Sequence, residues 1–174
     1  MISWIIGGTV TTALLFAGAT GAAGIDLPQA TGAHPPGMRE FTSPVDGFTV
    51  TQRFGCTPFL FEPSNPSCPS GHWHSGLDLA APAGGPVRAT LAGIATVTSS
   101  TQGYGLHIVI DHGGGLSSLY GHLSMADVLS GTPVEAGAVI GRIGSTGNST
   151  GPHLHFEIRR DNLPEDPAID ISLP

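Results

Sequence analysis

The run Gly-Pro-His-Leu-His-Phe-Glu-Ile at residues 151–158 limits the possible folds of this chain more than any other stretch. Polar and apolar residues alternate in it, and successive side chains of a β-strand point to opposite faces of a sheet. We therefore expect a strand that turns His153, His155 and Glu157 to one face and its apolar residues to the other. The apolar face fits a hydrophobic core. Two imidazoles and a carboxylate are costly to bury without partners, so the polar face indicates a site such as a metal centre.

A second run, His-Ser-Gly-Leu-Asp at residues 74–78, repeats this arrangement earlier in the chain. If it forms a strand, His74, Gly76 and Asp78 share a face, and the glycine leaves space between the two polar side chains. Two imidazoles and one carboxylate are a common ligand set for a catalytic zinc ion, which keeps its fourth position for water. The two runs together predict a zinc site, and His122, in a Tyr-Gly-His-Leu run, provides a further polar group.

The composition favours short strands joined by tight turns. Charged residues make up only 11% of the chain, whereas 26 residues are glycine and 15 are proline, which interrupt helices and favour turns. From residue 41 onward, short runs of strand-forming residues alternate with turn signals, and the glycine triplet at 113–115 predicts a hairpin. We therefore predict an all-β domain over residues 43–174, a mostly antiparallel sandwich or barrel.

The charged residues argue against several functions. The formal net charge is −7, all six basic residues are arginines, and no basic run is present. Nucleic acid is therefore not an expected partner, because binding to its phosphate backbone requires clustered positive charge. The absence of lysine also excludes a lysine-linked biotin or lipoyl group and Schiff-base chemistry.

The start of the chain indicates export. Residues 2–25 carry no charge, and their apolar first part is followed by small residues typical of signal-peptidase sites. We expect residues 1–24 to be a signal peptide, with a retained membrane anchor through residues 2–25 as the alternative. Residues 25–42 are rich in proline and glycine, which predicts a flexible linker.

The two cysteines, Cys56 and Cys68, bracket a proline-containing loop. We predict a structural disulfide between them, in preference to redox or metal chemistry. Closing a loop of this size stabilises a fold by about 3 kcal/mol in the chain-entropy model. Such a bond also indicates an oxidising, extracytoplasmic compartment.

Three separated motifs follow one another along the chain: His74-x-x-x-Asp78, Tyr-Gly-His-Leu at 120–123, and the histidine-rich run at 151–157. In this order they resemble the motifs of lysostaphin-type (LytM-like) zinc metalloendopeptidases, which cut peptide bonds in bacterial peptidoglycan. The resemblance covers residues 43–168. It implies a mostly antiparallel, duplicated-hybrid-motif-like β-fold, with the site in a groove on one sheet.

Carried over residue by residue, the resemblance implies that His74, Asp78 and His155 hold one zinc ion (Zn2+), while His122 and His153 are catalytic residues that do not bind it. A bound zinc ion acidifies water and polarises the scissile carbonyl. The two catalytic histidines would serve jointly as general acid and base, because imidazole titrates near neutral pH. The resemblance thus predicts an endopeptidase whose substrate is the peptide part of peptidoglycan. We expect an extracytoplasmic protein, secreted or anchored facing outward, and a monomer.

Two alternatives stay open. The first is a zinc-binding domain without activity that regulates cell-wall hydrolases, although such a domain needs neither His122 nor His153. The second is a carboxypeptidase of the D-alanyl type, although the longer His-to-Asp spacing and the Glu-x-x-His run of such enzymes are missing here. The motifs do not distinguish cleavage of glycine bridges from cleavage of direct cross-links, and the loop at 56–74 is expected to decide between them.

Expectations also follow for residues beside the predicted site. Glu157 is expected to form a surface ion pair with an arginine, and contact with a zinc ligand is the alternative. Tyr120 shares a strand face with His122 and could therefore donate a hydrogen bond to the substrate carbonyl. We expect His107 and His112, in the predicted hairpin, to be structural.

Overall fold

The computed structural model describes residues 41–171. The predicted signal peptide or anchor at 1–24, and all but the last two residues of the predicted linker at 25–42, lie outside the described residues. Within residues 41–171, no helix is long and apolar enough to cross a membrane.

Antiparallel strands make up almost all of the regular structure, which confirms the predicted all-β class. The only helical element in the described part is one 3-10 turn, η1 (Pro167–Ile169). From one edge to the other, the large sheet contains β1 (Thr49–Gln52), β4 (Leu77–Ala80), β12 (His153–Arg160), β8 (Leu116–Leu123), β7 (Leu106–Asp111), β6 (Gly93–Thr98) and β10 (Pro133–Val134), while β13 (Leu163–Glu165) pairs with β12.

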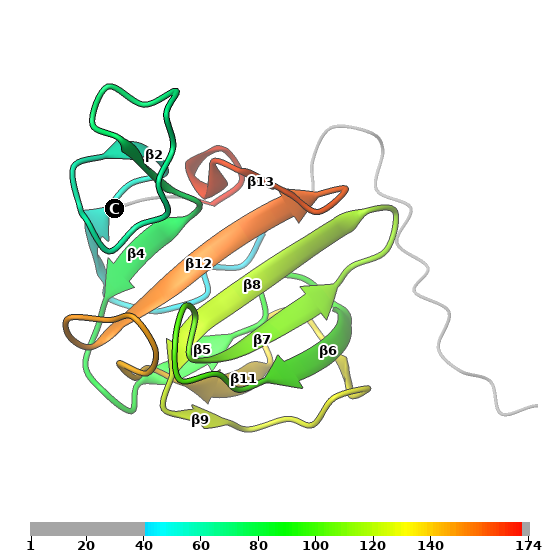
Figure 1. The fold of residues 1–174 in the computed structure, drawn as a ribbon. Coiled ribbons are helices and arrows are strands. Elements are labelled where there is room, and N and C mark those ends of the chain that lie inside the picture. The colour runs from blue at the N-terminus through cyan, green and yellow to red at the C-terminus, as the bar shows by residue number, and fades with distance from the viewer. Residues whose placement is uncertain (1–40, 172–174) are drawn as a thin grey trace, which may run out of the picture. The chain divides into compact units, whose positions relative to one another are not determined.

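Two smaller sheets complete the fold. One contains β5 (Pro86–Arg88), β11 (Val139–Arg142) and β9 (Met125–Ala126), and the other is the ribbon of β2 (Gly55–Thr57) and β3 (His72–His74). In Figure 1 the large sheet runs through the molecule with β12 near its centre, and the β2 ribbon lies beyond β4.

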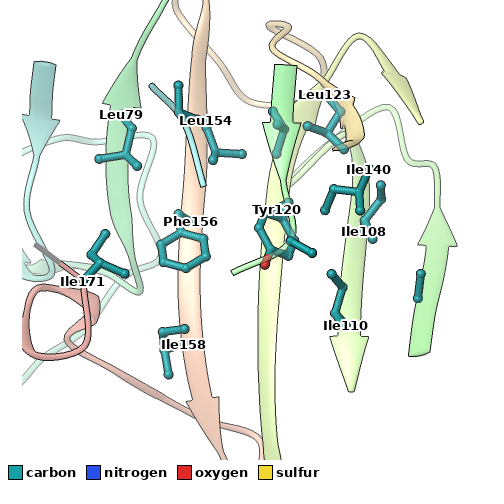
Figure 2. Packing of buried hydrophobic residues seen from close by; sticks show 14 of the residues in the cluster. Leu79, Ile108, Ile110, Tyr120, Leu123, Ile140, Leu154, Phe156, Ile158 and Ile171 are labelled. Carbon is teal, nitrogen blue, oxygen red and sulfur yellow. The ribbon is translucent and has the colours of Figure 1, made fainter. Parts of the chain in front are cut away.

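The hydrophobic core lies on one face of the large sheet. Leu154, Phe156 and Ile158 are fully buried there, as the alternation in this run predicts, and Figure 2 shows them beside Leu79 of β4. Ile140, from β11 of the small sheet, belongs to the same cluster. The core therefore holds β12 from its apolar side and leaves its polar side for the site.

The predicted hairpin at the glycine triplet is present. Strands β7 and β8 pair on either side of it, and Gly113, Gly114 and Gly115 have φ angles of 75°, 62° and 78°. Residues with a side chain rarely adopt positive φ angles, and least of all at three successive positions. This explains why glycine occupies all three.

The run at 74–78 is not the single strand that the alternation predicts. Strand β3 ends at His74 after pairing with β2, and β4 begins at Leu77, where the chain pairs with β12 instead. Between them, a side chain at Gly76 would overlap the carbonyl oxygen of Phe156 and lie 2.9 Å from Cγ of Glu157. The glycine therefore lets the chain cross close to β12, and His74 and Asp78 still reach the same place.

Candidate metal and active site

Three side-chain atoms form a small triangle where β3, β4 and β12 meet. Nε2 of His74 lies 3.1 Å from Oδ1 of Asp78 and 3.1 Å from Nδ1 of His155. The last two atoms are 3.0 Å apart, because Asp78 and His155 are direct partners in the pairing of β4 with β12. The structure thus brings together the three residues expected to bind zinc.

The donor set and its spacing fit a zinc ion. Zinc–nitrogen and zinc–oxygen bonds of about 2.0–2.1 Å place tetrahedral ligand atoms about 3.3 Å apart. The observed spacing of 3.0–3.1 Å is close to this value. Among residues 41–171, His74, Asp78 and His155 form the only group of three histidine, cysteine or acidic residues close enough together to hold a metal.

The other ring nitrogen of each histidine in the triangle is fixed by an acceptor behind it. Nδ1 of His74 donates to the carbonyl oxygen of Arg53 at 3.0 Å, and Nε2 of His155 donates to Oε1 of Glu157 at 2.9 Å. Such contacts orient the ring and leave the lone pair of the first nitrogen directed at the metal position. The two histidines therefore present different atoms, Nε2 and Nδ1, to the same point.

The charges in the triangle are strongly coupled. Burial acts to raise the pKa of Asp78, but hydrogen bonds with His155 and His74 outweigh it and hold that pKa well below its usual range. Burial acts to lower the pKa of His155, but the carboxylates of Asp78 and Glu157 outweigh it and raise the pKa to about 9. The two carboxylates thus favour positive charge at this ring. A metal ion at Nδ1 would replace its proton, since metals bind neutral histidine.

His122, near the end of β8, differs in its electrostatics. Its Nδ1 donates to the carbonyl oxygen of Thr146 at 2.8 Å, and burial lowers its pKa to about 4, which that hydrogen bond offsets only in part. The ring is therefore neutral at neutral pH, with the lone pair on Nε2. The backbone of His122 has a φ of 61°, an uncommon value for a residue other than glycine that often marks functional sites.

His153, the first residue of β12, lies beside His122, and their ring centroids are 4.7 Å apart. Nδ1 of His153 donates to the carbonyl oxygen of Gly151 at 2.8 Å and lies 3.3 Å from Oγ of Ser149. Its Nε2 lies 3.7 Å from Oδ1 of Asp78. His122 and His153 thus both adjoin the triangle without being part of it.

A cavity of about 680 Å³ opens over these groups. Asp78, His155, His122 and His153 all line it, so the metal position and the two further histidines share one space. The segment from 59 to 63 adds an apolar and acidic wall, and the other lining residues are mostly polar. The remaining lining residues are Thr51, Gln52, Phe59, Phe61, Glu62, Pro63, Ser75, Gly103, Tyr104, Asn148, Ser149 and Thr150.

The segment from 59 to 63 belongs to the cysteine loop. The predicted disulfide between Cys56 and Cys68 is present and closes this loop next to the pairing of β2 with β3. Nε2 of Gln52 donates to Oε1 of Glu62 at 3.1 Å, and the backbone N–H of Trp73 donates to the carbonyl oxygen of Pro63 at 3.0 Å. This part of the cavity wall is therefore tied to the strand that ends at His74.

The structure corrects the expectation for Glu157. Its side chain is fully buried, so its ion pair with Nε of Arg159, at 2.6 Å, is not on the surface. The same carboxylate contacts His155, the residue that the alternative expectation named as a zinc ligand. The alternation did place Glu157 on the site face, but local sequence gave no measure of how deeply that face is covered.

The expectation for Tyr120 is wrong. This side chain is fully buried in the core, and its hydroxyl accepts the backbone N–H of Thr90 at 2.8 Å and bonds Oγ of Ser118. The positive φ of His122 breaks the strand alternation, so the two residues do not share a face. His107 and His112, expected to be structural, bond the carbonyl oxygens of Gly105 and Ala92 and do not line the cavity.

Sequence reasoning named neither Tyr104 nor Ser75 at this site, and it expected an arginine beside Glu157 without identifying Arg159. Tyr104, Ser75 and Arg159 surround the carboxylate of Glu157. Local signals existed for two of them, because Ser75 is next to His74 and Arg159 lies two residues after Glu157 on the same strand face. Tyr104 lies in the turn before β7, far from the motifs in the sequence, and only the folded sheet brings it to β12.

The sequence of this chain matches a family model described as peptidase family M23 over residues 72–167. A relative named DD-carboxypeptidase/endopeptidase Mpg, from Neisseria meningitidis serogroup B, is 46% identical over 101 residues. The aligned part covers 58% of this chain but only 23% of that protein, so the chain spans less than a quarter of the relative's length.

Solved structures of similar proteins show the same fold. A zinc-containing peptidase from Vibrio cholerae superimposes with a TM-score of 0.63 and 35% identity, covering 78% of this chain and 41% of that one. The catalytic domain of the antimicrobial peptidase lysostaphin from Staphylococcus simulans gives a TM-score of 0.57 and 31% identity, covering 70% and 90%.

The matched residues 72–167 make up more than half of the 174 residues of the chain. They begin in β3, which carries His74 of the triangle, and they include His122, His153 and all of β12. The resemblance to lysostaphin-type peptidases that the motifs indicated is confirmed, and the chain belongs to peptidase family M23.

Proposed function

We propose that this chain is a zinc-dependent endopeptidase that hydrolyses peptide cross-links of bacterial peptidoglycan. The observation that carries the proposal is that His122 and His153 line the same cavity as the open side of the triangle. A purely structural zinc site is closed by four protein ligands, whereas a catalytic site has three and an open position. The name of the Neisseria relative favours the direct cross-links cut by DD-endopeptidases over glycine bridges.

In the proposed mechanism His74, Asp78 and His155 hold the zinc ion. Zinc bound there would supply a Lewis acid for the scissile carbonyl and lower the pKa of a water molecule. His122 can accept a proton at Nε2, because its Nδ1–H is donated to a carbonyl and the ring is neutral, although its lowered pKa makes it a weak base in the absence of substrate. His153 directs Nε2 toward the same side of the cavity. We assign the two histidines jointly to moving a proton from the attacking water to the leaving nitrogen.

Peptidoglycan lies outside the cytoplasm, so the proposal places the working protein there. The disulfide between Cys56 and Cys68 supports this location, because such bonds persist in oxidising compartments.

Incubation of the zinc-loaded protein with two peptidoglycans, one directly cross-linked and one glycine-bridged, tests the proposal. Mass spectrometry should detect a new amine terminus in the directly cross-linked material. The product should disappear after treatment with a chelator and in His153→Ala. Absence of cleavage in both substrates, with zinc confirmed in the protein, would contradict the proposal and favour a zinc-binding regulator of other cell-wall hydrolases.

A further inference from the structure

The carboxylate of Glu157 lies behind His155 and has no exposed surface. Its Oε1 accepts hydrogen bonds from Nε2 of His155 at 2.9 Å, from the hydroxyl of Tyr104 at 2.7 Å and from Oγ of Ser75 at 2.5 Å. Its Oε2 accepts a bond from Nε of Arg159 at 2.6 Å. A buried carboxylate is tolerated only when donors replace its lost hydration, and here both oxygens are fully engaged.

The donors come from separate parts of the fold. Ser75 lies in the crossing between β3 and β4, Tyr104 in the turn before β7, and Arg159 on β12. The Glu157 carboxylate therefore joins three chain segments at one point directly behind the metal position. A side chain placed in this way resists rotation, because each possible movement breaks a hydrogen bond made by a different segment.

Tyr104 contributes more than one contact. Its hydroxyl donates to Glu157 and accepts a bond from Nη2 of Arg159 at 3.2 Å, while its ring centroid lies 5.2 Å from that of His155. Its backbone carbonyl accepts the N–H of His122 at 2.7 Å. Although Tyr104 lines the cavity, its hydroxyl donates to Glu157, so this residue contacts the supports of both His155 and His122.

We infer that Glu157 and Tyr104, together with Ser75 and Arg159, are positioning residues that hold His155 with its proton on Nε2 and its lone pair on Nδ1. A neutral imidazole has two tautomers, and only the one protonated at Nε2 can bind metal through Nδ1. The carboxylate selects this tautomer and fixes the ring plane. The inference rests on the proposed zinc site and assigns part of its affinity to residues that do not touch the metal.

Zinc affinity tests the inference without any measurement of catalysis. We would compare the full chain with Glu157→Gln and Tyr104→Phe in competition with a chromophoric chelator. The matched control is Glu165→Gln, because Glu165 also pairs with an arginine at 2.6 Å but is exposed and contacts no site residue. Loss of a carboxylate behind a histidine ligand typically weakens metal binding by about 10- to 100-fold.

We expect the zinc Kd to rise by about 10- to 100-fold in Glu157→Gln, by less in Tyr104→Phe, and not at all in Glu165→Gln. The visible spectrum of bound cobalt(II) should shift in the first two variants only. In the double variant the effects should not add, because Tyr104 acts through Glu157. Additive effects would overturn the role of Tyr104, and wild-type zinc affinity in both single variants would overturn the inference.

Thermal unfolding of the metal-free proteins separates positioning from general damage. If Glu157→Gln is unfolded at the assay temperature, Tyr104→Phe decides the outcome, since it removes one oxygen atom and keeps the ring. Failure of the wild-type chain to bind zinc would contradict the proposed function. Tight binding by the wild type and by both variants would contradict only the positioning role.

Discussion

The site contains two pairs of histidines that differ in what faces the free ring nitrogen. In His74 and His155 this nitrogen lies 3.0–3.1 Å from other triangle atoms, with Asp78 between them. In His122 and His153 it adjoins the cavity, and Nδ1 of each ring donates to a neutral carbonyl oxygen, with Oγ of Ser149 as a further neighbour of His153. The free nitrogens of the first pair therefore face the Asp78 carboxylate, and behind the rings only His155 is supported by a second carboxylate, since His74, like His122 and His153, donates to a backbone carbonyl.

The electrostatic consequence is visible in the pKa values. Carboxylates raise the pKa of His155 to about 9 against the effect of burial, whereas burial lowers the pKa of His122 to about 4. A position that attracts a proton this strongly also attracts a metal cation. A neutral imidazole at the edge of the cavity keeps a lone pair that can accept a proton, although its lowered pKa makes it a weak base.

The largest effect is expected for Asp78→Ala. Its Oδ1 is the only anionic atom of the triangle, so the variant should retain no zinc after dialysis and show no detectable hydrolysis. Asp46→Ala is the control, because Asp46 is exposed and pairs with Arg88 away from the triangle. Elemental analysis measures the metal content. Stoichiometric zinc in Asp78→Ala would show that the ion binds elsewhere.

Removal of His122 or His153, which lie outside the triangle, should have a different result. His122→Ala and His153→Ala should keep stoichiometric zinc, while kcat falls by about 10²- to 10⁴-fold, the usual size of general acid–base effects. Metal content and turnover measured on the same samples distinguish the two pairs. If both variants lose zinc as Asp78→Ala does, the division between ligand and catalytic histidines is wrong.

The backbone beneath the triangle can be tested through Gly76. In Gly76→Ala the new methyl group would overlap the carbonyl oxygen of Phe156 and lie 3.1 Å from Nε2 of His155. We expect the free energy of unfolding to fall by about 1–3 kcal/mol, as for other overpacked sites, and zinc affinity to fall with it. Gly151→Ala is the matched control, since a methyl group there meets no atom within 4 Å. Equal stability of the two variants in chemical denaturation would contradict the close approach.

Short-range periodicity was enough to predict the buried face of β12 and the residues that meet in the triangle. The two-residue repeat placed Leu154 and Phe156 in the core, and the spacing of histidines predicted which groups converge. The two-residue repeat did not predict the side-chain directions where the backbone leaves the regular strand, which happens at Gly76 and at His122 with its φ of 61°. The contact of Tyr104 with β12 could not be predicted from a local pattern. It depends on where the loop between β6 and β7 lies in the folded sheet.

The smallest effect should come from Ser149, whose hydroxyl lies 3.3 Å from Nδ1 of His153. A neutral hydrogen bond at a solvent-accessible position contributes about 0.5–1 kcal/mol. We therefore expect Ser149→Ala to lower kcat by about two- to fivefold with zinc affinity unchanged, because the carbonyl of Gly151 still holds the ring. Ser130→Ala, at a serine that bonds only the backbone of Val97, is the control for steady-state kinetics. A loss as large as that of His153→Ala would mean that His153 depends on a side-chain partner as strongly as His155 does. The division between histidines that face Asp78 and histidines that adjoin the cavity would then not explain their proposed roles.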